Sequence, residues 1–132
     1  EHDEDDRYIT EAVFDEHHFD VRIHFVNNRD ELFAHLKSRV NGKQDNPSLI
    51  LLNYHTMPSN AVDIIRELKS NQAYREIPVV VLSGSINREV IAECYAAGAA
   101  SFIQKPVLSK ETDEKILRFF HYWFRTVELP QN

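Results

Sequence analysis

The stretch LILLN at positions 49–53 decides how the rest of this 132-residue chain is interpreted. Four consecutive apolar residues after a loop-like segment (41–48) are typical of a short strand that is buried on both faces. Comparable strand patterns occur at 79–82 and 101–104, and segments with apolar residues at helical spacing separate them. Strands that alternate with helices predict a parallel sheet covered by helices on both faces.

Right-handed crossovers between such strands favour the flavodoxin-like, doubly wound α/β fold with three α/β/α layers. Asn28 and Ser109 are available as helix caps, and Gly98 can end a helix in a left-handed conformation. The predicted helices are residues 5–17, 30–40, 62–68, 90–95 and about 109–128, and the predicted strands are residues 21–25 (near a sheet edge), 49–52, 79–82 and 101–104.

The length predicts one domain, residues 1–132, with no room for a separate DNA-binding domain. The 15 basic and 21 acidic residues give a net charge of −6, which disfavours binding to nucleic acid. A single cysteine, Cys94, excludes an internal disulfide framework and is interpreted as a small buried residue. No apolar run is long enough to span a membrane, so we expect a cytoplasmic protein.

Three polar residues each follow the end of a predicted strand: Asn53, Ser83 and Lys105. In open parallel sheets ligands bind at the carboxyl ends of the strands. We therefore expect these residues to converge on one crevice, although they are far apart in the sequence.

The order and spacing of these landmarks resemble the receiver domain of two-component response regulators, the CheY-like family. The similarity covers nearly the whole chain, from the acidic segment 1–7 to the Lys105-Pro106 pair, without insertions after Asn53. The aromatic ending, 120–130, resembles that of stand-alone regulators that partner phytochrome-like kinases. The resemblance implies a non-enzymatic role in phosphorelay signalling, with a sensor histidine kinase or another signalling protein as partner.

In that family an aspartate accepts a phosphoryl group from a histidine kinase beside a bound Mg²⁺ ion. The resemblance assigns each role to a position in this sequence: the phosphoacceptor position to Asn53, the phosphoryl-binding hydroxyl to Ser83, its cationic partner to Lys105, the aromatic switch to Phe102, and the metal positions to Glu1, His2, Asn53 and His55.

Asn53 changes this chemistry, because a neutral amide is no nucleophile toward phosphorus and binds Mg²⁺ more weakly than a carboxylate does. We therefore predict a phosphorylation-independent pseudo-receiver with no cofactor and weakened Mg²⁺ binding. One alternative is a Mg²⁺-dependent switch that is phosphorylated at another residue. A second is a flavodoxin-like flavin or nucleotide binder, against which the presence of only three glycines argues.

The last predicted helix carries more aromatic residues than one buried stripe needs, so some are expected on the surface. The predicted interface consists of Phe119, Tyr122, Trp123 and Phe124, used for dimerisation or for docking a partner. The alternative is that the tail folds back and buries these side chains itself.

A further expectation concerns the first strand, which is central in this fold. The sequence starts at the acidic loop that would follow this strand, so we expect an apolar strand before Glu1.

Overall fold

The computed structural model describes residues 28–42, 46–54, 60–84, 86–104 and 109–130. The helices are α2 (Arg29–Asn41), α3 (Ala61–Ser70), α4 (Arg88–Ala97) and α5 (Ser109–His121), which is followed by the π-helical turn η1 (Tyr122–Thr126). The strands are β1 (Ile50–Asn53), β2 (Val79–Ser83) and β3 (Ser101–Gln104). The predicted helix 5–17, the predicted strand 21–25 and any strand before Glu1 lie outside the described residues.

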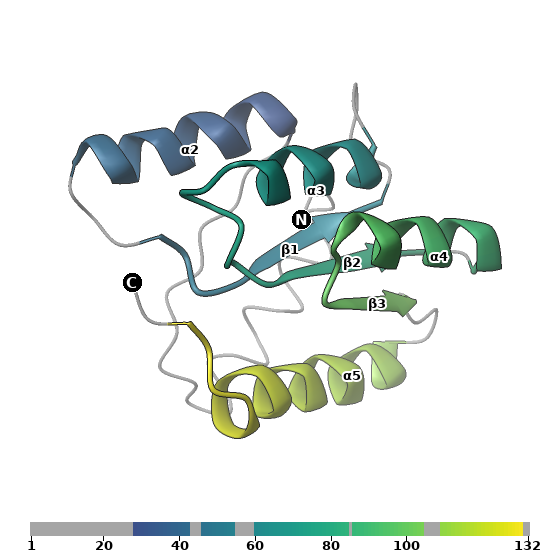
Figure 1. Cartoon of the computed structure of the whole chain (residues 1–132). Helices are drawn as coiled ribbons and strands as arrows, with labels where there is room; N and C mark the ends of the chain where they lie inside the picture. Colours follow the sequence, from purple (N-terminus) through teal and green to yellow (C-terminus); the bar gives the residue numbers. More distant parts are fainter. Residues whose placement is uncertain (1–27, 43–45, 55–59, 85, 105–108, 131–132) are drawn as a thin grey trace.

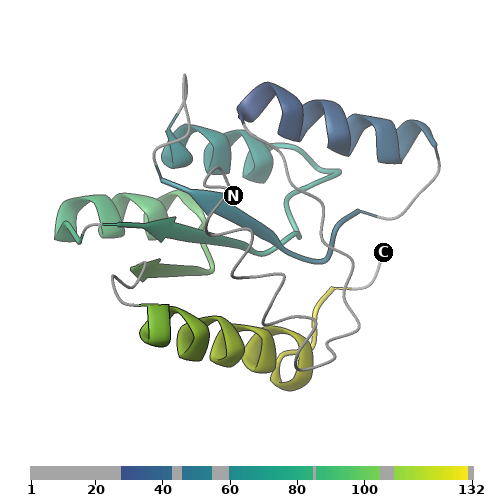
Figure 2. The same ribbon diagram turned by 180° about the vertical axis from the view of Figure 1, so that it is seen from behind.

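The described strands form one parallel sheet in the order β1-β2-β3. In its register Ile50 lies opposite Val79, and Val80 lies opposite Ser101. Figures 1 and 2 show α2, α3 and α4 on one side of this sheet and α5 on the other. The predicted parallel, three-layer arrangement is therefore confirmed in the described part of the chain.

The core lies between β2 and α3. Val79, Val80 and Val81 are fully buried, as expected for a strand covered on both faces. On α3, Ile64, Ile65 and Leu68 are 0–1% exposed and belong to the same apolar cluster as β1 and α2, with Leu32, Leu36, Ile50 and Leu52. Their spacing places them on one face of the helix, which is the pattern that predicted it.

Capping residues define the start of α2 and the end of α4. The Asn28 side chain accepts a hydrogen bond from the Glu31 N–H (2.9 Å), so its predicted capping of α2 is confirmed. Gly98 ends α4 with φ = +120°, and its N–H donates to the Cys94 and Tyr95 carbonyls. The predicted positive φ at Gly98 is thus confirmed.

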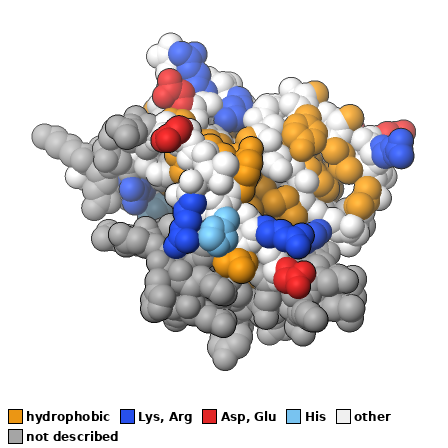
Figure 3. All heavy atoms as spheres, turned by 90° about the horizontal axis from the view of Figure 1, so that it is seen from below, with side chains coloured by type: hydrophobic (Ala, Val, Ile, Leu, Met, Phe, Trp, Pro, Cys, Tyr) orange, Lys and Arg blue, Asp and Glu red, His pale blue; other side chains and the backbone are white. Residues whose placement is uncertain are grey.

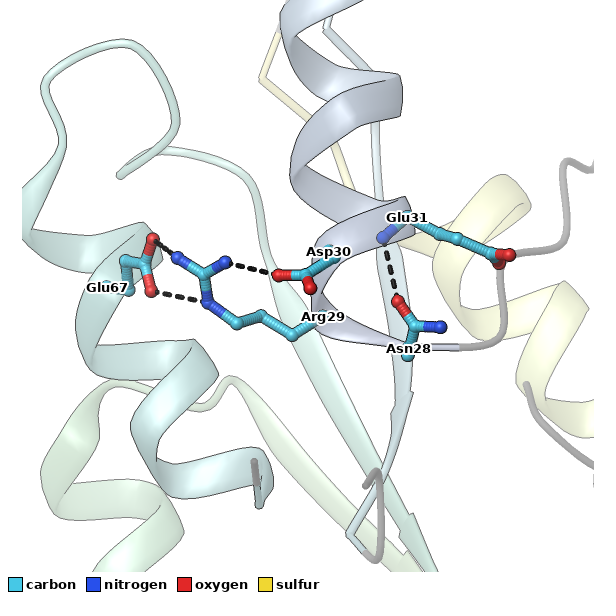
Figure 4. A network of polar contacts seen from close by, with 5 residues as sticks. All are labelled: Asn28, Arg29, Asp30, Glu31 and Glu67. Atoms are coloured by element: carbon cyan, nitrogen blue, oxygen red, sulfur yellow. Dashed lines mark hydrogen bonds and ion pairs between the residues drawn. The ribbon is translucent and has the colours of Figure 1, made fainter. Parts of the chain in front are cut away.

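One ion-pair network joins α2 to α3 (Figure 4). The Arg29 guanidinium contacts both carboxylate oxygens of Glu67, with Nε 3.0 Å from Oε1, and it also pairs with Asp30 at 2.8 Å. The guanidinium carbon lies 4.8 Å from the centre of the Phe33 ring. These carboxylates raise the pKa of Arg29. The fork geometry fixes the orientation of α2 against α3 in a way that a single point charge would not.

The C-terminal helix differs from the prediction of one continuous helix over 109–128. The α-helix ends at His121, and the chain widens into the π-helical turn Tyr122–Thr126, in which the Val127 N–H donates to the Tyr122 carbonyl (2.8 Å). A π turn rotates the following side chains relative to an α-helix. Here it accompanies burial of both Phe120 and Trp123, which leave 3% and 8% of their surface exposed.

Candidate functional site at the carboxyl ends of the strands

Asn53 and Ser83 lie at the same edge of the sheet. Asn53 is the last residue of β1 and pairs in register with Leu82, the residue before Ser83. Both side chains are buried, with 7% and 4% of the residue surface exposed. The structure therefore brings together two of the three residues that were expected to converge.

The loop that follows Asn53 is anchored at both of its ends. The Tyr54 N–H donates to the Leu82 carbonyl (2.8 Å), which continues the β1–β2 pairing by one residue. The Ala61 N–H donates to the Tyr54 carbonyl (3.1 Å), and the Asn60 side chain caps α3 at the Asp63 N–H (3.1 Å). Ala61 is fully buried, so its methyl group fills space in the core.

The third strand reaches the same edge through Gln104, which pairs in register with Ser83. Two side chains hold the backbone of this strand: the Phe102 N–H donates to the Tyr95 hydroxyl (3.2 Å), and the Gln104 carbonyl accepts from the Lys115 ammonium (2.8 Å). Sequence reasoning missed both contacts. Tyr95 and Lys115 lie on exposed helix surfaces with no motif around them, so no signal in the sequence could have found them.

Phe102, the predicted switch residue, lies in β3 and is half-buried against the apolar core. Four other predicted site residues, Glu1, His2, His55 and Lys105, lie outside the described residues. Their roles stay predictions.

The described part of this sheet edge carries the amide of Asn53 and the hydroxyl of Ser83, and both groups can donate and accept hydrogen bonds. Within the described ranges no group of three or more His, Cys, Asp or Glu side chains is placed to hold a metal ion. The neutral Asn53 amide is a poor substitute for a carboxylate ligand of Mg²⁺.

The predicted interface residues differ in exposure. Tyr122 is 54% exposed, Phe119 and Phe124 are half-buried, and Trp123 is 8% exposed. The expectation that Trp123 is a surface anchor is corrected by this burial, since its ring packs beside Phe119 (6.3 Å between ring centres) and Tyr122 (5.4 Å). Part of the aromatic tail thus covers itself, and Tyr122 is its exposed member.

Among proteins of known function, the chain is similar in sequence to several signalling regulators. No model of a known protein family matches the chain. The response regulator Rcp1 of Synechocystis sp. is 29% identical over 105 residues, which cover 77% of this chain and 71% of Rcp1. The two-component response regulator ARR7 of Arabidopsis thaliana is 34% identical over 71 residues, covering 54% of this chain and 34% of ARR7. In the regulatory protein RpfC of Xanthomonas campestris the match, 39% identical over 62 residues, covers only 8% of that protein.

Solved structures of response regulators superpose on nearly the whole length of this chain. The phosphorylated cyanobacterial phytochrome response regulator RcpA superposes with a TM-score of 0.89 at 24% identity, covering 99% of this chain and 94% of RcpA. The Mn²⁺-bound form of Rcp1 gives a TM-score of 0.88 at 23% identity, covering 99% of this chain and 95% of Rcp1. The chain has the CheY-like receiver fold and is similar to response-regulator receiver domains. Rcp1 and RcpA are among the proteins that it resembles in structure.

In the described part of the chain no helix is both long enough and apolar enough to cross a membrane.

Proposed function

We propose that this receiver domain, residues 1–132, acts in two-component signalling without being phosphorylated at its central site. The observation that carries the proposal is Asn53, a buried amide at the end of β1, beside the strand that ends in Ser83. An aspartate at this position could attack phosphorus and form an acyl phosphate. The Asn53 amide nitrogen cannot, because its lone pair is delocalised into the carbonyl group.

Signalling would then depend on binding. The domain acts as a protein-interaction module whose partner is a sensor histidine kinase or another signalling protein, and it is not an enzyme. The exposed Tyr122 and the half-buried Phe119 and Phe124 form the apolar part of the docking surface. Two copies of the chain can also pair through this helix, because aromatic side chains are frequent anchors of interfaces.

The roles that the resemblance assigns to Ser83, Phe102 and Lys105 belong to this proposal. Ser83 and Lys105 would hold the Asn53 side chain as they hold a phosphoryl group in active relatives, and Phe102 would stay in one orientation. The domain would thus present one fixed conformation to its partner.

The test is intact-protein mass after incubation with Mg²⁺ and acetyl phosphate, with Asn53→Asp as the matched variant. We expect a gain of one phosphoryl group by the variant and none by the parent. Phosphorylation of the parent would overturn the proposal and support a switch with another acceptor, to be located by peptide mapping. Failure of both proteins would show that the rest of the site is not functional as a receiver.

A further inference from the structure

Strand β3 is the outer strand of the described sheet. It pairs with β2 on one side, and within the described ranges no strand pairs with it on the other. Figure 1 shows this strand between α4 and α5. All four of its residues are half-buried, so the two helices do not cover the edge completely. An uncovered edge presents main-chain N–H and C=O groups with which a strand of another molecule can pair.

The sequence of β3 contains no charge and no proline, the features that commonly discourage pairing at a sheet edge. This holds for the whole segment 95–104, and Lys105 and Pro106 follow the strand without interrupting it. Phe102 and Ile103 are residue types that favour strands. Hydrophobic side chains also reach the surface on the side of the molecule that is seen from below (Figure 3). The strand therefore needs protection from outside its own sequence.

Two side chains occupy main-chain groups of this edge. The Phe102 N–H donates to the Tyr95 hydroxyl of α4 (3.2 Å), and the Gln104 carbonyl accepts from the Lys115 ammonium of α5 (2.8 Å). Residues two apart in a strand direct their main-chain groups to the same side. Because the Phe102 N–H is bonded to α4 and not to β2, that side faces away from the sheet. One donor and one acceptor of the edge are thus held by different helices.

We propose that Tyr95 and Lys115 close the β3 edge against pairing with a strand of a second copy of this chain. A second copy matches the edge because two identical, uncharged strands can pair antiparallel about a twofold axis, each presenting the same row of groups. An incoming strand would have to displace both side chains before its main chain could reach Phe102 and Gln104. The proposal concerns the sheet edge and is independent of the chemistry at Asn53.

The test variant is Tyr95→Phe with Lys115→Met, which removes one hydroxyl and one positive charge but keeps the ring and most of the apolar stem. The matched control, Tyr122→Phe with Lys37→Met, removes the same groups from exposed positions elsewhere on the surface. Sedimentation velocity of the full chain over a range of protein concentrations gives the average mass of each protein. Circular dichroism and urea denaturation show whether each protein is folded.

We expect the average mass of the test variant to rise with concentration to at least about twofold that of the parent. The control should not exceed the mass of the parent. Adding Ser101→Lys to the test variant should restore the mass of the parent, because a charge within the strand discourages pairing.

A folded test variant with the same mass as the parent would overturn the proposal. Association that survives the addition of Ser101→Lys would also overturn it, since another surface would then be responsible. If the double substitution unfolds the chain, the same measurement on Tyr95→Phe and on Lys115→Met separately decides the question, and association of neither would count against the proposal.

Discussion

The Lys115 ammonium lies 2.8 Å from the main-chain carbonyl oxygen of Gln104 and donates a hydrogen bond to it. This carbonyl belongs to the peptide bond that joins Gln104 to Lys105. Because a peptide unit is planar, a contact to its oxygen restrains the orientation of the peptide plane at the end of β3. A residue of α5 is thus connected to the edge of the sheet that carries Asn53 and Ser83.

Replacing Lys115 by Met should loosen the end of β3 with little effect on global stability. The methionine keeps most of the apolar stem but cannot donate the hydrogen bond. We expect faster amide hydrogen exchange in a peptide covering 101–106 and a free energy of unfolding within about 0.5 kcal/mol of the parent, as is usual for surface substitutions. Arg118→Met, on the same helix, is the control and should leave exchange in that peptide unchanged.

The core between β2 and α3 should determine most of the stability. Ile65 has no exposed surface, whereas Ile86 is 59% exposed. Ile65→Ala removes buried methyl and methylene groups and should lower the free energy of unfolding by about 2–5 kcal/mol. Ile86→Ala should change it by about 0.5 kcal/mol or less. Urea denaturation of both variants tests whether this core determines most of the stability. Similar losses of unfolding free energy in the two variants would contradict that expectation.

Gly98 should not tolerate a side chain, for two separate reasons. Its φ of +120° is unfavourable for other residues, and an added Cβ would lie 2.8 Å from Cγ of Lys69. Gly98→Ala should therefore destabilise the protein by at least about 1 kcal/mol. Gly84→Ala is the control, because no heavy atom lies within 4 Å of the Cβ position there.

A double-mutant cycle separates the two causes. Lys69 also donates to the Arg75 and Ile77 carbonyls (3.0 and 2.8 Å), so Lys69→Ala has a cost of its own. If the clash is real, Gly98→Ala should cost less in the Lys69→Ala background, and the remaining loss reports the backbone strain. An identical loss in both backgrounds would argue against the clash.

Cys94 should be protected from modification and should contribute to pH dependence at alkaline pH. Burial, with a smaller effect of the Glu93 carboxylate, raises the pKa of this fully buried thiol above its ordinary value of 9.0. The folded state therefore holds the thiol proton more tightly than the unfolded chain does. The stabilisation is fully present below pH 9.0 and is lost as the pH rises through the pKa of the folded protein.

The measurement is urea denaturation from pH 8 to pH 10.5 for the parent and Cys94→Ala. The parent should lose more stability over this range than the variant, which lacks the titrating group. Lys69, whose pKa is lowered by burial, makes an opposite contribution to the pH dependence of stability. This contribution is the same in the parent and in Cys94→Ala, so it cancels in their difference. Parallel plots of stability against pH for the two proteins would contradict the raised pKa of Cys94. Rapid iodoacetamide labelling of the native protein at pH 7 would contradict its burial.

The sequence by itself predicted the described strands, the four described helices and the position of Asn53 and Ser83 at the same edge of the sheet. These follow from local rules: the short apolar runs at 49–52 and 79–82 are typical of buried strands, and parallel strands place their carboxyl ends at one edge. Asn28 and Gly98 were predicted correctly for the same reason, since capping depends on neighbouring residues alone.

The tertiary structure decided what the aromatic and charged side chains of the last helix do. Whether Trp123 is buried and Tyr122 exposed depends on the π turn that follows His121 and on the packing of the Trp123 ring beside Phe119 and Tyr122, which helical periodicity does not encode. The contacts of Lys115 with Gln104 and of Tyr95 with Phe102 depend equally on how helices pack against β3. The physical reason is the range of the interactions: propensity and patterning act within a few residues, whereas these contacts exist only after the layers have assembled.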